Sequence, residues 1–164
     1  HELVLPIEVV PLDPAQPVYL TATVELGVCS DICVPAGFGF AATLPNPGAA
    51  DDKIRSALRQ RPSSAKEAGL RNISCRIEPI ADGLRVRAEM DLPSTGVGEA
   101  VVIEPGDPSV WVSEATVARH GRQLTATVEM VATDGSSLAL QRQAMIVTVL
   151  GERRAVEIHG CPAG

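Results

Sequence analysis

The sequence predicts an all-β protein in which an immunoglobulin-like β-sandwich follows a partial β-domain, the two being joined by one short helix. After residue 70, short runs of alternating apolar and polar residues recur, separated by Gly, Asp and Pro turn signals at the spacing typical of a sandwich. The apolar content is 45% but the aromatic content only 2%, so the core should be aliphatic. We therefore expect a partial β-domain at 1–45, a linker with a helix at 46–69 and the sandwich at 70–164. A small barrel is the competing topology.

The N-terminal segment holds three predicted strands. Residues 3–10 are rich in β-formers and lead into the turn-forming residues 11–14. Residues 18–26 alternate strictly between apolar and polar side chains, as a half-buried strand does, and residues 37–44 form the third strand. So few strands cannot bury an independent core, and this segment must pack on something else.

A short helix is predicted at 50–60, after a linker at 46–48. Asp51 and Asp52 stand where a helix N-terminus favours anions, and Pro62 ends the helix. Its apolar stripe, at three-to-four spacing, consists of Ile54, Ala57 and Leu58.

The remaining strands are predicted from alternation and from turns such as Asp82-Gly83 and His120-Gly121. These strands are expected at 74–80, 84–92, 99–104, 110–118, 124–131, 144–150 and 155–158. Trp111, in the fourth of them, is expected in the sandwich core.

Charge and composition exclude several classes of function. A net charge of -6 and a pI near 5.0 argue against a nucleic-acid surface, which needs a basic stripe. The sequence contains neither a long apolar run for membrane insertion nor a signal peptide. Because it begins at His1 rather than Met, we expect a mature or excised fragment.

Cys29 and Cys33 carry the candidate chemistry, in the segment Val-Cys-Ser-Asp-Ile-Cys-Val-Pro. Three residues separate them, so their Cα atoms can lie within disulfide range. A disulfide that closes so short a loop stabilises the fold little, which favours a reversible redox pair. Disulfides of this kind indicate an oxidising compartment. No Lys, Arg or His adjoins either sulfur, and Asp31 opposes thiolate formation. We infer a donor that reacts because a partner positions it.

Cys75 and Cys161 are expected to form a structural disulfide, because one opens the sandwich and the other follows its last strand. The long loop gives a stabilisation of about 4 kcal/mol in the chain-entropy treatment. Other interpretations of the cysteines stay open: an inert staple at Cys29 and Cys33, buried thiols, or a metal site using all four. His159 beside Cys161 could bind copper weakly.

Phe38 and Phe40 fall on one face of the third predicted strand. One interpretation is core packing. The other is a hydrophobic shield over Cys29 and Cys33 that a partner must displace.

The cysteine segment at 28–35 resembles the periplasmic N-terminal region of the DsbD/ScsB family of transmembrane protein-disulfide reductases, particularly the ScsB-like branch linked to copper tolerance and cytochrome c biogenesis. Residues 3–6 and 44–45 resemble the same context. The resemblance covers roughly residues 3–45, and the remainder agrees as a second β-domain joined by a short helix. DsbD itself has a wider cysteine spacing.

This resemblance implies a periplasmic electron-transfer domain without a bound cofactor, in which Cys29 and Cys33 match the redox positions. Reducing equivalents would pass from the membrane and C-terminal thioredoxin-like domains of the same reductase to thioredoxin-fold periplasmic proteins, by thiol-disulfide exchange. It also implies that residues 1–45 are part of a truncated sandwich whose missing edge is filled by another element or molecule. The alternatives are a structural immunoglobulin-like envelope module with inert disulfides, and a copper- or zinc-binding domain.

Overall fold

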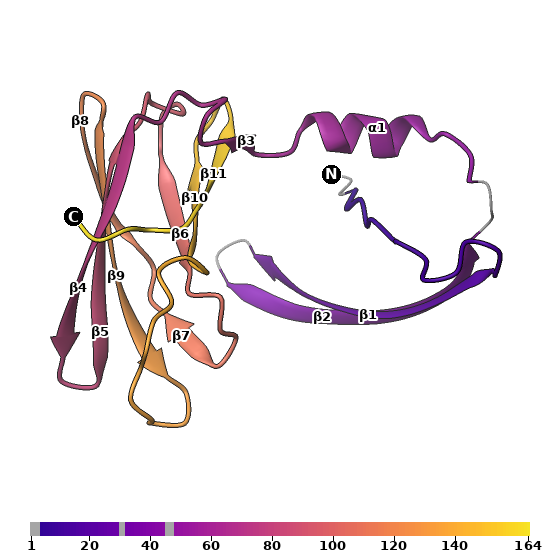
Figure 1. Ribbon diagram of the computed structural model, residues 1–164, viewed down its shortest axis with the longest axis horizontal. Coiled ribbons are helices and arrows are strands. Elements are labelled where there is room, and N and C mark those ends of the chain that lie inside the picture. Colours follow the sequence, from indigo (N-terminus) through magenta and orange to yellow (C-terminus); the bar gives the residue numbers. More distant parts are fainter. Residues whose placement is uncertain (1–3, 30–31, 45–47) are drawn as a thin grey trace. The chain divides into compact units, whose positions relative to one another are not determined.

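The computed structural model describes residues 4–29, 32–44 and 48–164. The chain divides into two compact units, His1–Gln60 (unit 1) and Arg61–Gly164 (unit 2). Strands dominate both units, and the described residues contain one short α-helix, which confirms the all-β prediction (Figure 1). That helix is too short to cross a membrane.

Unit 1 is built on one long antiparallel hairpin, β1 (Val18–Cys29) and β2 (Cys33–Leu44). Its register runs without interruption from Val18 opposite Leu44 to Cys29 opposite Cys33. The strands predicted at 18–26 and 37–44 are confirmed. Both extend further toward the cysteines than the alternation indicated, because pairing across the hairpin continues through Gly27 and Pro35.

The strand predicted at 3–10 is wrong over its described part, residues 4–10, which belong to no sheet. Several of its apolar side chains are exposed, with Leu5 and Ile7 each 62% accessible. Pro6 lacks a backbone N–H, and within the described chain the segment pairs with no neighbouring strand. Composition favoured a strand here, but a strand needs a partner.

The predicted helix is confirmed as α1 (Asp52–Arg59). Asp51 is its N-cap, and the Asp51 carboxylate accepts hydrogen bonds from the backbone N–H groups of Lys53 at 2.7 Å and Ile54 at 3.1 Å. The helix has no buried residue, so the Asp51 cap is an important part of its local stability.

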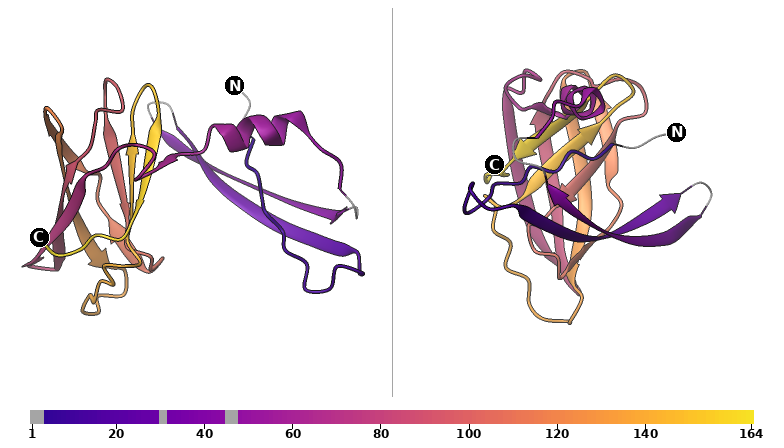
Figure 2. Two further views of the ribbon diagram at one scale, coloured as in Figure 1. Left: turned by 45° about the horizontal axis from the view of Figure 1, so that its top comes forward. Right: turned by 90° about the vertical axis from the view of Figure 1, so that its right-hand side faces the viewer.

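Unit 2 is a sandwich of two sheets, whose facing layers are visible in Figure 2. One sheet has the order β3 (Ser63–Ser64), β11 (Ala155–His159), β10 (Ile146–Leu150), β6 (Ala100–Glu104). The other has the order β4 (Asn72–Ile80), β5 (Gly83–Asp91), β9 (Gln123–Ala132), β7 (Val110–Val112), with β8 (Thr116–His120) also on β9. The short β3, which pairs in parallel with β11, was not predicted.

The core between the sheets is aliphatic, as predicted. It is formed by alternate residues of facing strands, the largest fully buried side chains being Met90, Leu92, Leu124, Met130 and Met145. Trp111 was expected there, but it is 56% exposed. Val110 and Val112 pack against the core instead, and strand alternation turns the residue between them outward.

The single strand predicted at 110–118 is split into β7 and β8 by a bulge. Val112 pairs with Met130 and Thr116 with Thr127, so one extra residue lies on the β7–β8 side. Ser113 bridges the break: its N–H donates to the carbonyl of Glu129, and its Oγ accepts the N–H of Glu129, both at 2.9 Å.

A partly buried ion pair ties the start of β6 to β8. The guanidinium of Arg119 donates to both carboxylate oxygens of Glu99 at 2.7 Å, and Thr95 donates to Glu99 from its N–H at 2.7 Å and its hydroxyl at 2.9 Å. Arg119 also donates to the carbonyls of Leu92 at 2.6 Å and Arg122 at 3.1 Å. The Glu99 side chain is only 7% exposed and that of Arg119 only 19%, so water screens this pair little.

Candidate redox site

Cys29 and Cys33 form the closing pair of the hairpin. Residues directly opposite in an antiparallel ladder have Cα atoms about 4.5–5.5 Å apart, which lies inside the range of about 4.4–6.8 Å that a disulfide tolerates. Cys33 is disulfide-bonded. The side chain of Cys29, with Ser30 and Asp31, lies outside the described residues. The backbone register therefore suffices to hold the two positions at disulfide distance.

The cysteine end of the hairpin is open to solvent. Cys33 is exposed, and its described neighbours Val28, Ile32 and Val34 are 61%, 74% and 54% accessible. The described residues on either side of Cys33, like Cys33 itself, are therefore accessible to solvent within unit 1.

The two faces of the hairpin differ sharply in character. The residues sharing the face of Cys33 are small or polar, with Gly27 opposite Pro35 and Glu25 opposite Gly37. The other face, which we call the apolar hairpin face, is apolar at every position. It consists of Val18, Leu20, Ala22, Val24, Leu26, Val28, Val34, Ala36, Phe38, Phe40, Ala42 and Leu44.

Phe38 and Phe40 are 52% and 40% exposed, so the described part of unit 1 does not bury them in a core. They pair with Val24 and Ala22 on the apolar hairpin face, and alternation along β2 puts them on the side opposite Cys33. Within this hairpin they do not shield the Cys33 sulfur.

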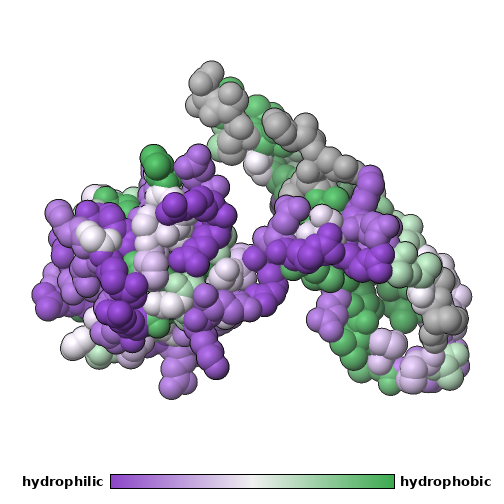
Figure 3. All heavy atoms as spheres, turned by 90° about the horizontal axis from the view of Figure 1, so that it is seen from above, coloured by the Kyte–Doolittle hydropathy of each residue, from purple (hydrophilic) through white to green (hydrophobic). Residues whose placement is uncertain are grey.

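The apolar hairpin face remains partly open. Green residues gather along the hairpin in Figure 3, and none of the described residues of unit 1 is buried. An isolated two-stranded sheet is at best marginally stable in water. The hairpin therefore has the composition of one layer of a core rather than of a free-standing ribbon.

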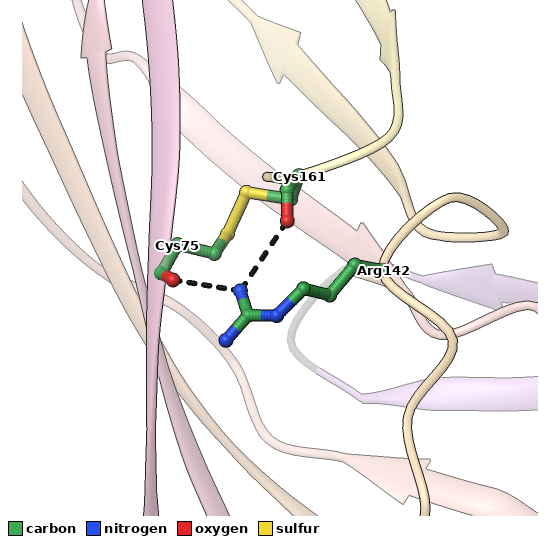
Figure 4. Close-up of a disulfide and its surroundings, with 3 residues drawn as sticks. All are labelled: Cys75, Arg142 and Cys161. Carbon is green, nitrogen blue, oxygen red and sulfur yellow. Dashed lines mark hydrogen bonds between the residues drawn. A yellow bond between two sulfur atoms is a disulfide. The ribbon is translucent and has the colours of Figure 1, made fainter. Parts of the chain in front are cut away.

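The second cysteine pair is a buried disulfide. Cys75 of β4 and Cys161, which follows β11, are 1% and 0% exposed, with Cα atoms 5.4 Å apart. Arg142 donates from Nη1 to the carbonyl oxygens of Cys75 at 2.7 Å and Cys161 at 3.4 Å (Figure 4). The Cys75 N–H donates to the carbonyl of Pro162 at 2.7 Å. This disulfide is fixed and out of reach of an attacking thiolate.

That bond also removes the basis for a four-cysteine metal site, because the sulfurs of Cys75 and Cys161 are joined to each other. The weak copper site suggested at His159 and Cys161 fails for the same reason, since Cys161 is oxidised and buried. Nε2 of His159 lies 2.7 Å from Oε1 of Glu157. Over the residues described, no group of three His, Cys, Asp or Glu side chains could hold a metal ion.

Comparison with known proteins gives one informative likeness. No family description and no curated protein matches the sequence. The N-terminal periplasmic domain of ScsB from Proteus mirabilis matches in structure with a TM-score of 0.61, over 89% of this chain and 58% of that chain. The chain has the fold of that ScsB domain. At 13% identity the likeness shows the fold alone, and it agrees with the resemblance seen around the cysteines.

Proposed function

We propose that this chain is a periplasmic thiol-disulfide exchange domain of an ScsB-like membrane reductase, with Cys29 and Cys33 as its redox pair. The observation that carries the proposal is an exposed, disulfide-bonded Cys33 held directly opposite Cys29 at the end of a hairpin. A disulfide that closes so short a loop stabilises the folded state little, so a reversible redox function explains it better than a structural one. The ScsB-like fold supports the cellular setting.

The proposed reaction transfers electrons in two stages, first from the reductase to the Cys29–Cys33 pair and then from the pair to a thioredoxin-fold protein. A thiolate of the reductase attacks one sulfur of the Cys29–Cys33 disulfide, forming a mixed disulfide and releasing the other sulfur as a thiolate. The second thiol of the reductase, once deprotonated, resolves this intermediate, leaving the reductase oxidised and the pair reduced. The pair then reduces the disulfide of a thioredoxin-fold protein in the same way. Each stage transfers two electrons and two protons from a dithiol to a disulfide, and no cofactor takes part.

The same proposal treats residues 1–45 as part of a larger β-domain. Its support is the apolar hairpin face, which offers twelve apolar side chains to a second β-layer. Covering that face would anchor the hairpin while leaving the opposite face, with Cys33, accessible to partners.

Trapping of a mixed disulfide tests the proposal. The reduced variants Cys29→Ser and Cys33→Ser are each incubated with an oxidised periplasmic thioredoxin-fold protein, and adducts are resolved by non-reducing electrophoresis and mass spectrometry. At least one variant is expected to accumulate a one-to-one adduct, because its single remaining sulfur can attack but cannot resolve. The unsubstituted protein is expected to turn over without accumulating it.

The double variant Cys29→Ser/Cys33→Ser is the matched control and should form no adduct, because Cys75 and Cys161 are buried and bonded to each other. Failure of both single variants to react with several such partners would contradict the proposed function.

A further inference from the structure

Gly27 and Pro35 form an unusual pair in the β1–β2 ladder. They lie opposite each other, two positions along the strands from Cys29 and Cys33 and on the same face of the hairpin. Gly and Pro are both depleted in β-strands, and here one of each occupies the two sides of a single pair. Two poor strand formers therefore stand beside the redox pair.

Each of these residues weakens the ladder in its own way. Pro35 has no backbone N–H to donate, and it is tolerated because both strands of a two-stranded sheet are edge strands. Gly27 has no side chain, so the pair lacks the cross-strand side-chain contact that stabilises a sheet. Glycine also gains the most backbone freedom when strand pairing is lost. This step of the ladder therefore holds the two strands together less firmly than a pair of β-branched residues would.

The weak step separates the cysteine end from the rest of the hairpin. Beyond it the register continues with the pair Val28 and Val34 and ends at the cysteine pair. Val28 and Val34 are 61% and 54% exposed, so burial within unit 1 contributes little to keeping this end closed. Because the residue before a proline is restricted to extended conformations, Val34 keeps the backbone after Cys33 extended when the ladder loosens.

The firmness of the ladder beside the cysteines affects the stability of their disulfide. A disulfide closes more easily when the surrounding structure already holds the two thiols together, because less chain entropy is lost on closure. A firmly paired ladder up to the cysteines would supply this preorganisation and would favour the oxidised form. A loose step beside the cysteines does not supply it, so the disulfide is easier to reduce.

Resting on the function proposed above, we propose that Gly27 and Pro35 are positioning residues of the redox site. They act through the spacing of Cys29 and Cys33, by keeping this end of the ladder loose enough for the disulfide to open at the potentials of thioredoxin-type exchange proteins.

Redox titration of two substitutions tests this inference. Gly27→Thr and Pro35→Thr each introduce a β-branched residue, and the second also restores the backbone N–H. Each protein is equilibrated in dithiothreitol buffers of graded potential, and its thiols are alkylated and quantified by mass spectrometry. The double variant should favour the oxidised pair about tenfold more than the unsubstituted protein does, which shifts the midpoint by about 30 mV toward more negative potentials. Each single variant should shift the midpoint part of the way in the same direction.

Gly39→Thr is the matched control. It makes the same chemical change on the same face of β2, six residues from Cys33, and an added Cβ would lie 3.7 Å from the Ala22 carbonyl oxygen, an ordinary contact. Its midpoint should equal that of the unsubstituted protein.

A midpoint of the double variant that is unchanged or less negative would overturn the inference while leaving the redox pair intact, and so would an equal shift in Gly39→Thr. An unsubstituted protein whose Cys29–Cys33 pair no buffer of the series reduces would instead contradict the function on which the inference rests.

Discussion

Removal of the Cys75–Cys161 disulfide is expected to lower the free energy of unfolding of unit 2 by about 4 kcal/mol. The bond joins residues 86 positions apart, so it restricts the unfolded chain strongly. It also fixes the segment after β11 beside β4, where Cys75 and Ala163 form a β-bridge. Urea unfolding of Cys75→Ala/Cys161→Ala, followed by the fluorescence of Trp111, reports on unit 2, since Trp111 is the single tryptophan of the chain.

The control is Cys29→Ala/Cys33→Ala. These residues belong to unit 1, so the Trp111 transition should change by less than about 0.5 kcal/mol, as for substitutions outside the unit being observed. A loss below about 1 kcal/mol in the Cys75 and Cys161 variant would contradict the structural role of that disulfide.

Glu99→Gln is the second substitution with a large expected effect, a loss of about 3 kcal/mol in the free energy of unfolding of unit 2. The amide keeps one acceptor oxygen where Arg119 donates to two, and it leaves a guanidinium that is 19% exposed without its counter-ion. Urea unfolding followed at Trp111 measures the loss.

Glu129→Gln makes the same chemical change in the ion pair with Arg85, whose side chains are 46% and 48% exposed. Exposed pairs contribute little, so this variant should unfold almost as the unsubstituted protein does. Equal losses in the two variants would show that the environment of Glu99 has no special part in stability.

The contribution of Glu99 should also depend on pH. Burial raises the pKa of Glu99, but the hydrogen bonds from Arg119 and Thr95 and the charge of Arg119 outweigh burial, and the pKa is lowered overall. A lowered pKa in the folded state stabilises the protein fully above the unfolded value of about 4.3, and the benefit is lost as the pH falls through the folded value. The stability difference from Glu99→Gln should therefore shrink below about pH 4, whereas a constant difference would contradict this cause.

Local alternation was enough to locate most strands, because successive side chains of a strand point alternately to the buried and to the exposed face of the sheet. It failed where the deciding interaction lies elsewhere in the chain. Residues 4–10 have the composition of a strand but no partner in the described chain. Trp111 follows the same rule: the sequence favours burial of an aromatic ring, whereas the pairing of β7 with β9 turns Val110 and Val112 inward.

At the candidate site, spacing anticipated the closeness of Cys29 and Cys33 but not the faces of the hairpin. The third strand was expected to begin at residue 37, so Phe38 and the cysteines were not counted along one strand. Once β2 begins at Cys33, the odd separation of five residues between Cys33 and Phe38 assigns them to opposite faces. The separation of Cys33 and Phe38 can be read from the sequence. Assigning the two residues to faces also requires knowing where β2 begins, and that boundary is determined by its pairing with β1.

The redox behaviour of the Cys29–Cys33 pair tests the central claim most directly. The protein is equilibrated in glutathione and dithiothreitol buffers of graded potential, thiols are alkylated, and each cysteine is quantified by mass spectrometry. The pair should titrate as a two-electron couple between about −270 and −180 mV, as thioredoxin-type exchange proteins do, while Cys75–Cys161 stays oxidised. A midpoint below about −300 mV for Cys29 and Cys33 would mark a permanent staple and contradict the account.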